Sequence, residues 1–378
     1  KLQALCYKME IERSLRTPHL AGFQLLGLQD FPGQGTALVG VLNAFYGEKG
    51  YISKKEFSRF CNSTVPLLKL SKFTWMNQET LTADALLFHY GKKELTQLKL
   101  HWSMRDQSGK IIRQGLFEPP TVPTGSTTSI GRLTIELGNI KTAGQFTIRL
   151  QVMGTSWMNE WPVWVYPSTL PSTETQELYT TDTLDEKAEK ILSSGGKVLL
   201  LLNGKVKKGR EVIQAFTPVF WNTSWFKMRP PHTLGLLMDP AHPVWKNFPT
   251  EYHSNLQWWE IANGAQVMHL EKLPPTLQPL IRSIDTWFMN RRLAMLFEVK
   301  VNGGRLMVCS ADISSNLEQR PVARQLAYSI RNYMSGELFK PQLSVSVNQI
   351  RELVTNESEF VFDAFTKGTP DELKPVKQ

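Results

Sequence analysis

The sequence predicts a multi-domain protein that combines α/β and all-β parts, and three observations support this prediction. The length of 378 residues predicts two or three domains, because one domain has roughly 100–200 residues. Residues 62–167 contain strand-sized runs separated by turns, whereas residues 176–341 alternate helical patterns with continuous apolar runs. Residues 1–61 follow neither pattern and form a third part.

The composition is that of a globular protein. Apolar residues make up 41% and charged residues 20%, which excludes wholesale disorder, collagen and coiled coil. No apolar run reaches the roughly 18 residues that a membrane span needs, so we expect none. The net charge of +9 is spread over the whole length, so we expect no nucleic-acid partner. Cys6, Cys61 and Cys309 are too few and too scattered for a disulfide framework or a zinc ribbon.

Residues 1–61 predict a helix, a strand and a second short helix. Apolar residues recur at three- and four-residue spacing from Leu2 to Leu15, and Thr17-Pro18 ends this helix. A short apolar strand over 21–30 then breaks at a Gly- and Pro-rich turn, and Ser53-Lys-Lys-Glu56 is a capping box. The chain starts at Lys1 without a signal segment, so we expect a processed chain or a portion of a longer one.

Residues 62–167 predict an antiparallel β-sandwich of the immunoglobulin type. Short strands with Thr, Val, Ile and aromatic residues, separated by Gly, Pro, Ser and Asn turns, are typical of that fold. The strands are expected at Thr80–His89, Gln97–Arg105, Leu133–Leu137 and Gln145–Val152. Residues 168–175 read as a linker.

Residues 176–341 predict an α/β domain whose sheet is covered on both faces. A helix over Asp185–Leu192 stops at Gly195-Gly196 and is followed by the all-apolar strand 197–202. Two more strands, Leu293–Val301 and Arg305–Cys309, precede a closing helix. That helix is expected over Arg320–Tyr333, and residues 342–378 form a tail.

The main candidate binding feature is the density of aromatic residues over 216–260. Trp and Tyr rings can stack on the C–H faces of sugars while Asn, Gln and Glu bind the hydroxyls, but the same residue types also build domain interfaces and cores. Both interpretations stay open. The candidate sugar-binding residues are Trp221, Asn222, Trp225, His253 and Trp258.

Catalytic and metal sites are not expected from the remaining motifs. Glu160 and Glu251 imitate the carboxylate pair of a retaining glycosidase. The first falls in the last strands of the predicted sandwich and the second in an irregular loop, so neither stands at the end of a barrel strand, and catalysis is not expected of them. Cys309 lacks a nucleophile elbow, so a buried, inert thiol is expected. Asp239, His242 and His253 lack metal-ligand spacing, and the Gly-Gly pairs lack a phosphate-binding or dinucleotide fingerprint. We therefore expect no metal and no cofactor.

Several long motifs carry a resemblance to a known family. They are KLQALCYK at 1–8, GFQLLGLQDFPGQGTALVG at 22–40, FWNTSWF at 220–226, FPTEYHSNLQWW at 248–259, NRR at 290–292 and RPVAR at 320–324. Over essentially the whole chain the sequence resembles the C-terminal portion of glycoside hydrolase family 2-like proteins. These are relatives of β-galactosidase and β-glucuronidase from polysaccharide-degrading bacteria.

The resemblance implies an architecture. Residues 1–61 would be the last helix–strand piece of a TIM barrel, with 26–31 as its eighth strand. Residues 62–167 would be the immunoglobulin-like domain, and 176–341 a glutamine-amidotransferase-like, flavodoxin-like α/β domain without its catalytic residues. Gln29, Asp30 and Phe31 would then lie at the active-site rim as structural or substrate-binding residues.

The resemblance also implies a function. The family's two catalytic glutamates would lie upstream of Lys1, so the chain would be a non-catalytic portion of a retaining β-glycosidase. Its expected partners are an oligosaccharide or polysaccharide and the rest of the parent barrel, in the periplasm or outside the cell, and an oligomer is possible. Two alternatives stay open: a carbohydrate-binding or scaffold module, and an amidotransferase-like enzyme that uses Cys309.

Overall fold

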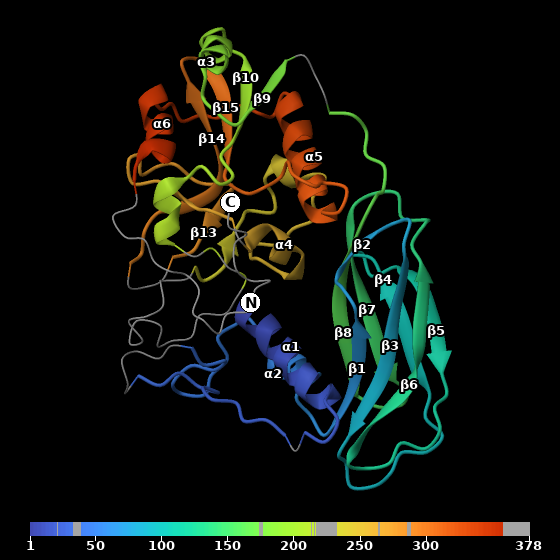
Figure 1. Cartoon of the computed structure of the whole chain (residues 1–378). Helices are drawn as coiled ribbons and strands as arrows, with labels where there is room; N and C mark the ends of the chain where they lie inside the picture. Colours follow the sequence, from blue (N-terminus) through green and yellow to red (C-terminus); the bar gives the residue numbers. More distant parts are fainter. Residues whose placement is uncertain are drawn as a thin grey trace. The chain divides into compact units, whose positions relative to one another are not determined.

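The chain folds into two compact units, residues 1–168 and 169–378. The computed structural model describes residues 1–20, 22–32, 39–173, 177–212, 214, 216, 233–263, 265–285 and 289–357 (Figure 1). No helix in these ranges is long and apolar enough to cross a membrane.

The first unit contains two β-sheets that share one core. The three-stranded sheet has the order β1-β3-β6, and the five-stranded sheet has the order β2-β8-β7-β4-β5. All pairs are antiparallel except β2 with β8, which is parallel. The strands are β1 (Thr64–Leu70), β2 (Thr74–Met76), β3 (Thr80–His89), β4 (Leu100–Arg105), β5 (Ile111–Phe117), β6 (Ser126–Glu136), β7 (Gly144–Val152) and β8 (Met158–Tyr166).

Side-chain alternation explains how the two sheets come to face one another. Every second residue of β3 is buried, as the period of two along a strand requires. Leu81 and Leu87 of β3 share a hydrophobic core with Ile148 and Leu150 of β7, which belongs to the other sheet. The sequence prediction of β3 is confirmed residue for residue, and that of β7 to within one residue.

The N-terminal region of the first unit contains helices but no strand among its described residues. α1 (Leu2–Arg16) ends at Thr17, and the predicted capping box of Ser53 and Glu56 opens α2 (Lys54–Phe57). Both helix predictions are confirmed. Between the helices, Gln29 pairs with Leu42 only as an isolated bridge.

The second unit contains one seven-stranded mixed sheet. Its strand order is β11-β13-β14-β15-β10-β9, with β12 paired to β14, and only the β9–β10 and β10–β15 pairs are parallel. The strands are β9 (Leu178–Thr181), β10 (Lys197–Leu201), β11 (Leu236–Leu237), β12 (Met268–His269), β13 (Ile281–Ser283), β14 (Leu293–Val301) and β15 (Gly304–Cys309). The helices are α3 (Glu186–Ser193), η1 (Lys207–Glu211), η2 (Pro243–Trp245), η3 (Leu256–Trp258), α4 (Trp259–Ala262), α5 (Pro321–Ser335) and α6 (Val347–Thr355).

The core of the second unit is formed by the buried apolar residues of its central strands. The five residues of β10 are buried, and Val198 and Leu200 pack with Phe297 of β14. Helix α6 begins at a second capping box, Ser346 with Gln349, and buries Leu353 in the same core. The predicted strands β10, β14 and β15 and the helices α3 and α5 are confirmed to within two residues.

The predicted fold class, however, is wrong. The chain is a mixed α/β protein with three sheets and few helices, and residues 26–31 form no barrel strand. The parallel β2–β8 pair departs from the expected antiparallel sandwich, and an immunoglobulin sandwich is not shown. Strands β14 and β15 form an antiparallel hairpin, whereas the neighbouring strands of a flavodoxin-like sheet are parallel. Local periodicity predicted single strands correctly, but it carries no information on which strands pair.

Candidate functional site

Helix α1 is fixed to the two-sheet part of the first unit by a buried carboxylate. Glu12 is only 4% exposed. Its two oxygens accept hydrogen bonds from Trp161 Nε1 and from Asn159 Nδ2, both at 2.8 Å, and one of them pairs with Lys8 on the preceding turn. A buried carboxylate is stable only when its charge is compensated and its lone pairs accept hydrogen bonds. Here Trp161, Asn159 and Lys8 supply the three donors.

Lys8 completes this network. Its ammonium donates to Asn159 Oδ1 at 2.8 Å and lies over the Trp161 ring, 4.8 Å from the centroid. Burial lowers the pKa of Lys8, and the neighbouring Glu12 carboxylate opposes that shift. Asn159, which is fully buried, therefore bridges the cation and the anion: its amide oxygen accepts from Lys8 and its amide nitrogen donates to Glu12.

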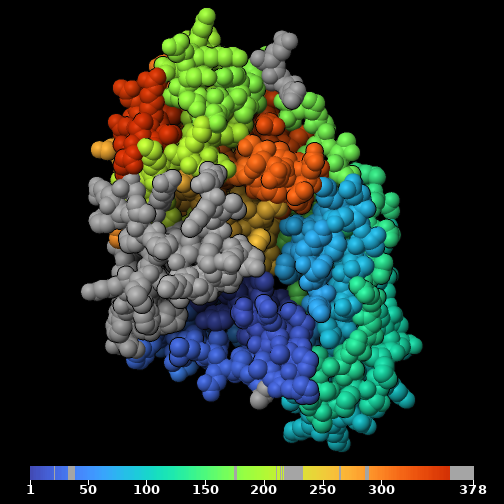
Figure 2. Space-filling view, viewed as in Figure 1, coloured from blue at the N-terminus to red at the C-terminus, as the bar shows by residue number. Residues whose placement is uncertain are grey.

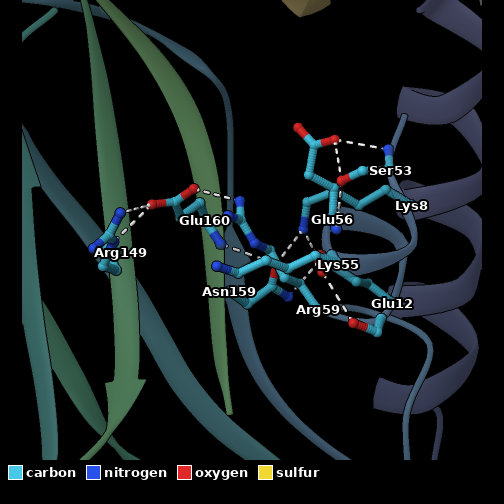
Figure 3. Close-up of polar contacts among 10 residues, drawn as sticks. Lys8, Glu12, Ser53, Lys55, Glu56, Arg59, Arg149, Asn159 and Glu160 are labelled. Atoms are coloured by element: carbon cyan, nitrogen blue, oxygen red, sulfur yellow. Dashed lines mark hydrogen bonds and ion pairs between the residues drawn. The ribbon is translucent and has the colours of Figure 1, made fainter. Parts of the chain in front are cut away.

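Glu160, the next residue, is held by two arginines. Its carboxylate accepts from Arg59 Nη1 at 2.7 Å and from Arg149 Nε at 2.6 Å, and Figure 3 shows it between these two side chains. Arg149 faces Glu160 across the β7–β8 pair. Both carboxylate oxygens are thus engaged in ion pairs with arginines of the same unit. The Asn159-Glu160 pair thus has a structural role in the first unit.

Asp30 forms a second ionic clamp in the same unit. Its buried carboxylate accepts from the Gly40 amide at 2.9 Å and from Lys49 Nζ at 2.6 Å, while Lys49 also donates to the Gly40 carbonyl at 2.8 Å. A Cβ on residue 40 would lie 2.2 Å from the carbonyl carbon of Gln29, so only glycine fits there. The clamp locks two stretches of irregular backbone together.

The clamped segments present apolar side chains to solvent. Phe45 is 92% exposed and Leu26 is 82% exposed, although neither is on a regular element. Exposed apolar groups that gather on one surface mark binding or interaction sites more often than scattered ones do. We give the name 23–46 face to the large exposed apolar residues of this stretch of sequence, which are Phe23, Leu26, Leu28, Phe31, Phe45 and Tyr46. Their segments belong to the N-terminal region, which is blue in Figure 2.

The structure places the three predicted rim residues on this clamp. Asp30 points inward to Lys49, Gln29 is half-buried beside it, and Phe31 is exposed. Sequence reasoning missed Gly40 and Lys49, the partners of Asp30. No local pattern could have identified Lys49, because it lies 19 residues along the chain from the carboxylate that it neutralises.

The predicted sugar-binding residues of the second unit have other surroundings. Trp258 is fully buried and packs edge-on against Trp245 and Phe248, so a sugar could reach its ring only if these neighbours moved. His253 is half-buried, and its backbone bridges Leu237. Trp221, Asn222 and Trp225 lie outside the described residues.

The other reactive groups of the second unit have structural partners. Glu251 accepts from Asn255 Nδ2 at 2.8 Å. Cys309 is buried, and desolvation raises the pKa of its thiol to about 12, which suppresses the thiolate that a nucleophile needs. Burial lowers the pKa of His242, and its Nδ1 accepts from the Val244 amide. The described ranges contain no group of three His, Cys, Asp or Glu residues that could hold a metal ion.

Comparisons with known families match two parts of the chain. Residues 179–355 match a family model described as a domain of unknown function, DUF8487. Residues 79–167 match a second one, DUF8488. The two matches lie in the second and first unit, respectively. No curated protein matches the chain.

Similarity to solved structures is weak. A family 123 glycoside hydrolase from Clostridium perfringens is 10% identical, with 39% of each chain covered and a TM-score of 0.22. The sporulation control protein Spo0M from Bacillus subtilis is 12% identical over 28% of this chain and 50% of its own, with a TM-score of 0.22. The alkylpurine DNA glycosylase AlkC from Pseudomonas fluorescens is 10% identical over 30% of this chain and 33% of its own, also at 0.22. The chain thus spans a third to a half of these proteins, and such scores support no inference about fold or function.

Proposed function

We propose that the chain is a non-catalytic portion of a retaining β-glycosidase that takes part in polysaccharide breakdown in the periplasm or outside the cell. The observation that carries this proposal is the 23–46 face, which the Asp30–Lys49 clamp holds in place with its aromatic side chains exposed. In this role the face contacts the remaining part of the parent enzyme. The sequence motifs at 1–8 and 22–40 supply the link to the β-glycosidases.

The non-catalytic part of the proposal rests on how the acidic residues are used. A retaining glycosidase needs two carboxyl groups about 5–5.5 Å apart, one as nucleophile and one as acid/base. Glu160 is neutralised by Arg59 and Arg149, and Glu12 is enclosed by Lys8 and Trp161. Neither carboxylate is available to attack a sugar carbon.

Hydrolysis of aryl β-glycosides tests the proposal. We expect no steady turnover of aryl β-galactoside or β-glucuronide by this chain. The Glu160→Gln and Glu251→Gln variants should match the unaltered chain, and Glu318→Gln serves as a control outside the network. Turnover that either of the first two substitutions abolishes, while the control keeps it, would overturn the proposal. A second measurement tests whether a longer parent enzyme exists. The natural gene product should then have a mass much larger than 43.1 kDa.

The second candidate is a carbohydrate-binding or scaffold module. The exposed rings of Phe31, Phe45 and Tyr46 favour it, because flat aromatic groups bind the C–H faces of sugars. Calorimetric titration with galactose- and rhamnose-containing oligosaccharides separates the candidates. Binding that disappears in Phe45→Ala but persists in Tyr252→Ala, an exposed aromatic residue of the second unit, would favour this module.

A further inference from the structure

A pocket of about 440 Å³ lies at the amino-terminal edge of the parallel strands in the second unit. Helix α3 ends at Ser193, and the turn through Gly195 and Gly196 leads directly into β10 at Lys197. This turn, the start of β9 and the start of β15 line the pocket. Figure 1 shows α3, β9, β10 and β15 at one end of this unit. The volume falls within the range of roughly 300–1,000 Å³ that is typical of small-molecule sites.

Two cations line this pocket. Lys197 and Arg305 are paired in register on neighbouring parallel strands, which directs their side chains to the same face of the sheet. The Lys197 side chain is only 8% exposed. Its ammonium donates to the Ser335 carbonyl at 3.3 Å, and Arg305 Nη1 donates to the Phe339 carbonyl at 3.2 Å. An ammonium has three N–H donors and a guanidinium five, so both side chains keep donors for a further acceptor.

The remaining lining residues indicate which ligand charge the pocket favours. Glu177 is the acidic residue of the lining, with its carboxylate 3.8 Å from Lys197 Nζ and 78% exposed to solvent. Two cations and one anion leave a net charge of +1, which favours a monoanion over a dianion. Ser194 adds a hydroxyl whose oxygen can still accept, since it donates to the Ile191 carbonyl. Tyr179 and Ile191 complete the lining.

We propose that this pocket binds a hexuronate, a sugar that carries one carboxylate and several hydroxyls. In this proposal the carboxylate of the sugar pairs with Lys197 and Arg305, and its hydroxyls form hydrogen bonds with Ser194 and the backbone of the glycine turn. The choice of a sugar rests on the proposed function, whereas the preference for an anion rests on the pocket alone. Glu177 already pairs with Lys197 at 3.8 Å, so the two cations keep one positive charge in excess, and a ligand carboxylate can pair with it.

Calorimetric titration of the full chain with sodium glucuronate tests the proposal, with glucose and inorganic phosphate as comparison ligands. We expect glucuronate to bind, glucose to bind at least tenfold more weakly, and the glucuronate affinity to fall as salt is raised. Arg305→Gln should weaken glucuronate binding about tenfold or more, because it removes a charge-assisted hydrogen bond. Lys246→Gln, which removes one exposed charge of the same unit, should leave binding unchanged.

A second variant guards against loss of folding. Ser194→Tyr keeps every charge and places a ring in the pocket from an exposed position at the end of α3, so it should block binding while the melting temperature stays unchanged. Glucuronate binding that survives Ser194→Tyr and Arg305→Gln, or glucose binding equal to that of glucuronate, would overturn the site. Phosphate binding tighter than that of glucuronate would overturn the hexuronate assignment. None of these results bears on aryl glycoside turnover, so the proposed function is tested separately.

Discussion

The buried carboxylate of Glu12 offers the most demanding test of how the first unit is held together. Glu12→Ala removes the acceptor for Trp161 Nε1 and Asn159 Nδ2 and leaves the Lys8 ammonium without its anionic partner. Glu10, two residues earlier on α1, is exposed and provides a matched control at Glu10→Ala.

The expected loss follows from the contacts. Removing one partner of a buried ion pair costs about 3–5 kcal/mol, because the other charge stays buried and unpaired. The Lys8 side chain retains 16% exposure and can recover some hydration, so we expect the low end, about 3 kcal/mol. A unit of this size loses about 2–4 °C of melting temperature per kcal/mol, which predicts a decrease of about 6–12 °C.

Denaturant unfolding followed by circular dichroism measures this loss. The exposed control should change stability by less than about 0.5 kcal/mol. In a double-mutant cycle, Lys8→Met combined with Glu12→Leu should cost less than the sum of the two single changes, since no unpaired charge remains. A Glu12→Ala loss as small as that of Glu10→Ala would refute the reasoning, and so would strict additivity in the cycle.

Three further predictions concern other parts of the chain. Gly40→Ala should make the 23–46 face markedly more sensitive to proteolysis, because the new Cβ would lie 2.2 Å from the Gln29 backbone; unchanged protection would contradict the clamp. Cys309, with a pKa of about 12, should be alkylated at pH 8 far more slowly than after unfolding in denaturant, and equal rates would show that it is accessible. Burial raises the pKa of Glu298 above 4.5, the value expected in the unfolded chain. The folded state therefore binds this proton more tightly than the unfolded state does. Ionisation of Glu298 lowers the stability of the fold as the pH rises from 4.5 through the raised pKa. Glu298→Gln should therefore be more stable than the unaltered chain at pH 7, with a difference that shrinks toward pH 4.5; a constant difference across this range would contradict the assignment.

The sequence predicted single elements better than it predicted their assembly. Strand β3 and the capping box of α2 are determined by residues adjacent in the chain, and both were predicted correctly. Strand β1 was missed because its first five residues are all buried, so it lacks the alternation that marks a half-buried strand. The parallel β2–β8 pair joins residues about 90 positions apart, and no local pattern carries that information.

The candidate sites show the same division. The motif around Asp30 predicted a residue at an active-site rim, whereas the structure shows its carboxylate paired with Lys49, which is distant in sequence. Aromatic density over 216–260 could not separate a buried ring such as Trp258 from an exposed one such as Trp259, because burial depends on packing partners elsewhere in the chain. The pocket at Lys197 and Arg305 arises from strand register, so it was invisible before the fold was known.

The central claim of the proposed function is that Glu12, Glu160 and Glu251 have structural partners and break no glycosidic bond. A retaining glycosidase forms a covalent glycosyl–enzyme intermediate, and 2-deoxy-2-fluoro glycosides trap it. Intact-mass spectrometry after incubation with the activated fluoro-galactoside and fluoro-glucuronate measures this directly. The account predicts an unchanged mass, whereas a single added sugar mapped to Glu160 or Glu251 would contradict it.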